Sequence, residues 1–153
     1  MTADELRVRH DDTPQPPPQE ARKVKVLVVD DHRDTRGLME LLLQDAGYDV
    51  RQAEDGTMAL DVARRWRPEV IVTDVFMDHM DGVDLIQAVR RQGWRTKLIA
   101  VSAGWRRPGP DGSDEAGPDV LEDAISAGAD ATLLKPLDGR ELLATLARVL
   151  SAR

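Results

Sequence analysis

The chain of 153 residues has a net charge of −7 and no cysteine, and this length suits one domain with a substantial core rather than two. The acidic balance argues against a nucleic-acid-binding protein, because neutralising phosphates needs a clustered basic surface, and the absence of cysteine excludes disulfides, thiol catalysis and thiolate metal sites. Without a secretion signal or an apolar run of membrane-spanning length, the sequence predicts a cytoplasmic protein with no nucleic-acid or membrane partner.

Residues 1–23 differ in composition from the rest of the chain. Prolines occupy positions 14, 16, 17 and 18, and apolar residues are scarce. Such a segment cannot bury enough apolar surface to offset the entropy lost on ordering. We predict a disordered tail, which is either inert or a proline-rich ligand for a partner domain, and a folded domain over 24–153.

From residue 24 onward, short β-rich apolar runs alternate with longer stretches of helical spacing. The apolar runs are VKVLVV (24–29), YDVRQA (48–53), EVIVTD (69–74), TKLIAVS (96–102) and ADATLL (129–134). The helical stretches carry their apolar stripes over 38–46, 59–66, 85–89, 120–125 and 142–150. Three acids, Asp34, Asp55 and Asp138, are predicted helix N-caps.

Five strands alternating with five helices predict an α/β, doubly wound fold with a parallel sheet, since parallel strands need crossover connections. In such a sheet, ligands bind outside the carboxyl ends of the strands. The polar residues at those ends are Asp30, Asp31, Asp74, Ser102 and Lys135. Each has a simpler explanation as a helix cap, a turn hydroxyl or a surface residue, but their joint occurrence at strand ends favours one site.

Two adjacent acids follow the first predicted strand. If both were buried and ionised, Asp30 and Asp31 would repel one another by roughly 4 kcal/mol at about 4 Å in an effective dielectric of about 20. A divalent cation, a basic side chain or exposure to water would each relieve that repulsion. Because carboxylate oxygens suit Mg²⁺, we favour this ion over a transition metal bound by His32 or His79.

Four segments place an acid pair, a single Asp, a Ser and a Lys-Pro pair after successive strands. They are VLVVDDHRD (26–34), DVFMDHMDGVDLI (74–86), IAVSAG (99–104) and GADATLLKPL (128–137). Together they resemble the receiver domain of two-component response regulators, the CheY-like superfamily, over residues 24–150. The resemblance implies a flavodoxin-like fold, in which a five-stranded parallel sheet of order 2-1-3-4-5 is flanked by five helices.

The resemblance also implies a phosphoryl-transfer site. In the family, the Asp that ends the third strand accepts a phosphoryl group from a phosphohistidine, and the matching residue here is Asp74. Asp30, Asp31, Asp74 and the backbone carbonyl of Phe76 would hold Mg²⁺, for which Mn²⁺ can substitute. The Ser102 hydroxyl would donate a hydrogen bond to a phosphoryl oxygen.

The same resemblance implies that Lys135 pairs with the acyl phosphate and that a cis Lys135–Pro136 bond directs its ammonium into the site. The phosphoryl donor would be a sensor histidine kinase or a histidine phosphotransfer protein, and a downstream protein target would receive the signal. We accordingly expect a bacterial signalling protein, a monomer or weak homodimer, which is not an enzyme beyond catalysing its own phosphotransfer and dephosphorylation.

Two residues depart from the family pattern. Asp78 replaces the usual Pro after the phosphoacceptor, and Thr132 replaces the usual aromatic residue that moves with the Ser or Thr on activation. The aromatic half of the family's switch is therefore missing from this sequence.

The connection 104–119, between the fourth strand and the fourth helix, is rich in Gly and Pro and much longer than the usual roughly 4–6 residues. We hypothesise that its residues Trp105, Arg106 and Arg107 respond to phosphorylation or contact a partner; the alternative is a tolerated surface insertion. No output module follows the domain in this sequence, which predicts a stand-alone, single-domain regulator.

Two other functions stay open. A pseudo-receiver that acts only as an interaction scaffold is compatible with Thr132 and Asp78, but the complete acidic set and Lys135 argue against it. A phosphatase with Asp74 as its nucleophile would need a second Asp where this chain has Phe76. Nucleotide binding is disfavoured, because no glycine-rich phosphate-binding loop follows the first strand.

Overall fold

The structure, a computed structural model, describes residues 22–77, 79–102, 106–108, 111, 114–116 and 120–152. Its centre is a five-stranded parallel sheet of order β2-β1-β3-β4-β7. The strands are β1 (Lys25–Val29), β2 (Asp49–Ala53), β3 (Val70–Asp74), β4 (Lys97–Ser102) and β7 (Ala131–Leu134). The predicted parallel sheet and its strand order are confirmed.

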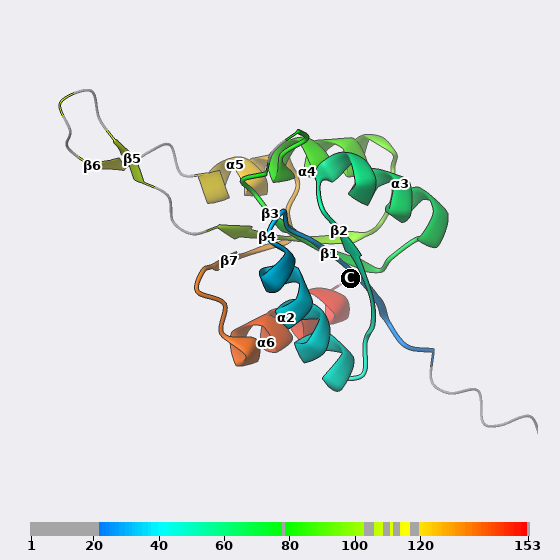
Figure 1. Cartoon of the computed structure of the whole chain (residues 1–153). Helices are drawn as coiled ribbons and strands as arrows, with labels where there is room; N and C mark the ends of the chain where they lie inside the picture. The colour runs from blue at the N-terminus through cyan, green and yellow to red at the C-terminus, as the bar shows by residue number, and fades with distance from the viewer. Residues whose placement is uncertain are drawn as a thin grey trace, which may run out of the picture.

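Five helices of the described part of the chain cover the two faces of this sheet. They are α2 (Arg33–Asp45), α3 (Gly56–Trp66), α4 (Gly82–Arg91), α5 (Val120–Ala127) and α6 (Gly139–Ser151). Figure 1 shows α2 and α6 on one face and α3, α4 and α5 on the other. None of the helices within the described ranges is long and apolar enough to cross a membrane.

The inner strand β1 is buried on both faces. Val26 and Val28 belong to the core cluster formed with α2 and α6, whereas Leu27 and Val29 belong to the cluster formed with α3, α4 and α5. All four side chains are fully buried. A strand covered on both faces needs apolar residues at every position, which explains the unbroken apolar run that precedes the two acids.

Two of the three predicted N-caps are confirmed. The carboxylates of Asp55 and Asp138 accept hydrogen bonds from backbone N–H groups in the first turns of α3 and α6, at 2.8 and 2.9 Å. The prediction for Asp34 is wrong. The His32 carbonyl already accepts the first helical hydrogen bond, from Arg36 N at 3.1 Å, so His32 is the N-cap and Asp34 lies in the first turn of α2.

The buried face of α2 also differs from the predicted stripe. Its buried residues are Arg36, Met39 and Leu43, whereas Leu38 and Leu41 are 58% and 67% exposed. The positions of α2 that face the sheet are 36, 39 and 43, which share one face of a helix by their spacing of three and four residues. An arginine therefore lies on the core side of this helix.

The connection 104–119 contains a short antiparallel strand pair that the sequence did not predict, β5 (Arg106–Pro108) and β6 (Asp114–Ala116), separate from the central sheet. Arg106 and Arg107 lie in β5, but their side chains, like Trp105, Asp78 and the tail 1–21, are outside the described residues. The hypothesis that Trp105 and these arginines respond to phosphorylation therefore stays a prediction.

One glycine sets the packing of α4 against the end of β3. The Gly82 N–H donates to the Val75 carbonyl at 2.9 Å. A Cβ at this position would lie inside van der Waals contact of the Asp74 carbonyl oxygen and 2.8 Å from Cα of Val75. Only a residue without a side chain allows α4 to begin so close to the end of β3.

We therefore expect Gly82→Ala to lower the free energy of unfolding by about 1–3 kcal/mol, the usual cost of overpacking. Gly37→Ala is the matched control, because no atom lies within 4 Å of the added Cβ, and helix propensity should raise stability by about 0.5–1 kcal/mol. Urea unfolding of both variants checks this pair. Equal effects of the two substitutions would contradict the proposed contact at Gly82.

Candidate functional site

Four strand ends meet at one edge of the sheet. Asp30 directly follows β1, Asp74 ends β3, Ser102 ends β4 and Lys135 directly follows β7. The Lys135 N–H donates to the Ser102 carbonyl at 2.8 Å, so the last two ends are joined by a backbone hydrogen bond. Strand β1 lies between β2 and β3, where the sheet changes its direction of winding, and this is where such folds bind ligands.

Two buried carboxylates share the ammonium group of Lys135. Its Nζ donates to Asp30 Oδ2 at 3.0 Å and to Asp74 Oδ2 at 3.2 Å. The side chains of Asp30 and Asp74 are 1% and 7% exposed, and that of Lys135 is 22% exposed. Charges this deeply buried need paired, hydrogen-bonded partners, and Lys135 supplies one partner for both acids.

The electrostatics of this trio are unbalanced. Burial raises the pKa of Asp74, Lys135 opposes that rise, and the neighbouring Asp30 adds to it, so the pKa lies above its ordinary value. Burial alone would lower the pKa of Lys135, but hydrogen bonds and charge from the two acids outweigh it and raise that pKa. Lys135 is therefore cationic at neutral pH, and Asp74 ionises at a cost in free energy.

The other carboxylate oxygen of each acid accepts a backbone hydrogen bond. Asp30 Oδ1 accepts from the His32 N–H at 2.8 Å, and Asp74 Oδ1 accepts from the Phe76 N–H at 3.3 Å. An Asp31 carboxylate oxygen lies 3.0 Å from His32 Nδ1. One potential ligand atom from each of Asp30, Asp31, His32 and Asp74 lies within 4.8 Å of the others, so this group can hold a metal ion.

The donor set fits a hard dication. Three carboxylates and one ammonium converge here, which leaves a surplus of negative charge that a divalent cation would neutralise. Carboxylate oxygens are the protein ligands that Mg²⁺ prefers. The surplus of negative charge is therefore consistent with Mg²⁺, the ion that the sequence favoured.

The other predicted site residues lie close to this edge in the fold. Ser102 is buried, with 2% exposure, and Phe76 is 41% exposed. The Lys135–Pro136 peptide bond is cis. Thr132 is half-buried within β7, on the strand face opposite the one that Ala131 and Leu133 present to α2 and α6.

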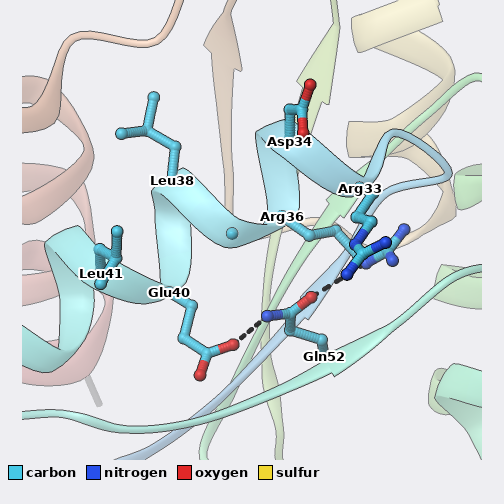
Figure 2. Close-up of a pocket in the computed structure, with 8 residues that line it drawn as sticks. Arg33, Asp34, Arg36, Leu38, Glu40, Leu41 and Gln52 are labelled. Atoms are coloured by element: carbon cyan, nitrogen blue, oxygen red, sulfur yellow. Dashed lines mark hydrogen bonds between the residues drawn. The ribbon is translucent and has the colours of Figure 1, made fainter.

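A buried arginine supports Asp30, and the sequence did not predict it. Arg36 Nη1 donates to the backbone carbonyl of Asp30 at 2.8 Å, and its Nε donates to Gln52 Oε1 at 3.1 Å. The Gln52 amide donates in turn to the Glu40 carboxylate. Figure 2 shows the two hydrogen bonds that join Gln52 of β2 to Arg36 and Glu40 of α2, along the wall of a surface pocket. An arginine on a helix is usually solvent-exposed, so only its spacing from buried neighbours could have indicated this role.

Comparison with known proteins gives a consistent family. The model of the response regulator receiver domain matches residues 26–147. The nitrate/nitrite response regulator protein NarP of Escherichia coli (strain K12) is 37% identical over 126 residues, 81% of this chain and 54% of that protein. The response regulator MprA of Mycobacterium sp. (strain KMS) is 34% identical over 127 residues, 83% of this chain and 50% of that protein. The chain thus spans about half the length of these curated relatives.

Solved structures of similar proteins match the fold of this chain over nearly their full length. Chemotaxis protein CheY4 of Vibrio cholerae has a TM-score of 0.71 at 36% identity, covering 83% of this chain and 98% of that one. The receiver domain of the Francisella response regulator 1452 has a TM-score of 0.70 at 28% identity, covering 83% of this chain and 96% of that one. With its acidic crevice and parallel sheet, the chain belongs to the receiver domain family of two-component response regulators.

Proposed function

We propose that this domain accepts a phosphoryl group on Asp74 in a Mg²⁺-dependent transfer and thereby switches its contacts with other proteins. The observation that carries the proposal is the Lys135 ammonium, which contacts Asp74 and Asp30 at the same time. The donor is a sensor histidine kinase or a histidine phosphotransfer protein, and the output is a protein target.

Phosphoryl transfer needs an aligned nucleophile and positive charge more than covalent participation of other groups. An Asp74 oxygen forms a bond to phosphorus while the bond from phosphorus to the donor imidazole breaks, and the imidazole keeps the electron pair. Bound Mg²⁺ supplies positive charge to the phosphoryl oxygens, and Asp30, Asp31, Asp74 and the Phe76 carbonyl are the groups that would hold it.

Lys135 and Ser102 stabilise the product in this scheme. Lys135 already contacts the acceptor carboxylate, so its ammonium pairs with the phosphoryl group as negative charge accumulates there. Ser102 ends the neighbouring strand, and its hydroxyl donates a hydrogen bond to a phosphoryl oxygen. The Lys135 N–H donates to the Ser102 carbonyl at 2.8 Å, which holds the backbones of these two residues side by side.

Incubating the EDTA-treated chain with acetyl phosphate and Mg²⁺ tests this function. We expect intact-mass measurement to show one added phosphoryl group on the wild type, none without Mg²⁺ and none on Asp74→Asn. Asp84→Asn, an exposed acid in the first turn of α4, is the matched control and should be modified like the wild type. A modified Asp74→Asn variant, or an unmodified wild type, would contradict the assignment and favour an interaction scaffold.

Arg36 positions Asp30 in this scheme, because it donates to the backbone carbonyl of the residue whose carboxylate would bind the metal. We expect Arg36→Met to weaken Mg²⁺ binding roughly 10-fold or more, as loss of a group supporting a metal ligand does. Calorimetric titration measures this affinity. Arg33→Met, which removes an exposed arginine from the same helix, is the control; equal loss in both variants would show a general charge effect instead.

A further inference from the structure

A groove lies at the edge of the sheet opposite the acidic crevice. It has a volume of about 410 Å³ and lies at the amino ends of two strands, where Glu69 precedes β3 and Lys97 begins β4. Its apolar wall consists of Pro68, Trp94 and Leu150, and the last two side chains are half-buried. A groove of this size with an accessible aromatic ring has the usual features of a site for an apolar ligand.

Two residues in the left-handed backbone conformation shape this groove. Arg67 caps the carboxyl end of α3 with a φ of 57°, and its guanidinium carbon lies 4.7 Å from the centroid of the Trp94 ring. Gly93, with a φ of 75°, directly precedes Trp94. A residue other than glycine is strained in this conformation, and such strain concentrates at ligand-binding sites. The groove thus presents an aromatic ring with a cation against it.

The groove is also positively charged. Arg67, Arg95 and Lys97 line it, and among the residues that the structure describes none of these three forms an ion pair. The Glu69 carboxylate, which also lines the groove, accepts a hydrogen bond from the backbone N–H of Lys25. The groove therefore suits a ligand that combines apolar rings with negative charge.

The chain enters the sheet beside this groove. Arg22 is the first residue that the structure describes, and its guanidinium lies 3.9 Å from the Glu69 carboxylate. Backbone hydrogen bonds of 2.9 Å join Glu69 to Lys25 on one side and to Lys97 on the other. Neighbouring strands are about 4.8 Å apart, so the groove begins one strand away from the point at which residues 1–21 join the domain.

The sequence just before Arg22 has the composition that this groove suits. Proline occupies positions 14, 16, 17 and 18, and acids stand on both sides of this run, at 11, 12 and 20. Proline-rich segments favour the extended polyproline conformation and bind in aromatic-lined grooves. Pro18 is four residues from Arg22, which spans about 12 Å at roughly 3.1 Å per residue. The proline run can therefore reach the groove.

We propose that the proline run, residues 14–18, binds in the groove at Trp94 of the same molecule. Proline rings pack against the indole, and the flanking acids face Arg67 and Arg95. Because the run is tethered close to the groove, its effective concentration there is roughly millimolar, so a weak contact is enough to populate the bound state. The groove lies at the sheet edge opposite Asp74, and this contact does not depend on phosphoryl transfer.

A spin label tests the proposal in the full chain. The chain has no cysteine, so Gln15→Cys provides a single attachment point for a nitroxide inside the proline run. We expect the label to broaden the NMR signals of Trp94 Nε1–H and Arg95 N–H more than that of Asp49 N–H. Asp49 pairs directly with Lys25 from the other side of β1, so an unbound run would broaden its signal at least as strongly.

Two variants of the labelled chain identify the contact. We expect the selective broadening to be lost when Pro16→Ser, Pro17→Ser and Pro18→Ser are combined, and also in Arg95→Glu. Arg91→Glu is the matched control, because Arg91 is an exposed arginine of α4 outside the groove, and it should keep the broadening.

Three results would overturn the proposal. The first is broadening in the labelled chain that is no stronger at Trp94 and Arg95 than at Asp49. The second is selective broadening that survives the proline substitutions or Arg95→Glu. The third is broadening passed from a labelled chain to an unlabelled, ¹⁵N-enriched copy in a mixture, which would assign the groove to the proline run of a second copy.

Discussion

The Lys135 ammonium lies between two buried carboxylates that belong to the ends of different strands. Asp30 and Asp74 approach the same Nζ at 3.0 and 3.2 Å, and this cation offsets part of their negative charge. The parallel order of the sheet makes the contact possible, because β1, β3 and β7 end at the same edge. Without the cation, two nearly dehydrated carboxylates would repel each other across the crevice.

Other features of the fold keep these groups in place. Gly82 allows α4 to begin against the backbone of Asp74, and Arg36 bonds to the carbonyl of Asp30 from the opposite face. The acids are thus fixed by backbone contacts that do not depend on their own charge. Buried charges of this kind lower the free energy of unfolding, and such destabilising groups are common at functional sites.

The sheet was predictable because its three inner strands, β1, β3 and β4, are buried on both faces and consist mainly of apolar residues. The acids, Ser102 and Lys135 were identifiable because they follow the apolar runs of the sequence. Arg36 was not, since an arginine on a helix ordinarily faces solvent, and its buried position depends on where α2 begins. Helix α2 begins at Arg33, two residues before the start that an N-cap at Asp34 implies, and this explains the wrong N-cap. The orientation of the His32 ring depends on tertiary geometry that no spacing encodes.

The cost of ionising Asp74 is the most direct test of this electrostatic arrangement. Because its pKa is raised above the ordinary value of 3.8, the penalty is present above the folded-state pKa and disappears as the pH falls through it. In EDTA at neutral pH, we expect Asp74→Asn to have a higher free energy of unfolding than the wild type, with the difference shrinking on acidification and on addition of Mg²⁺. If Asp74→Asn is no more stable than the wild type at neutral pH in EDTA, ionised Asp74 does not destabilise the fold, and this electrostatic arrangement is contradicted.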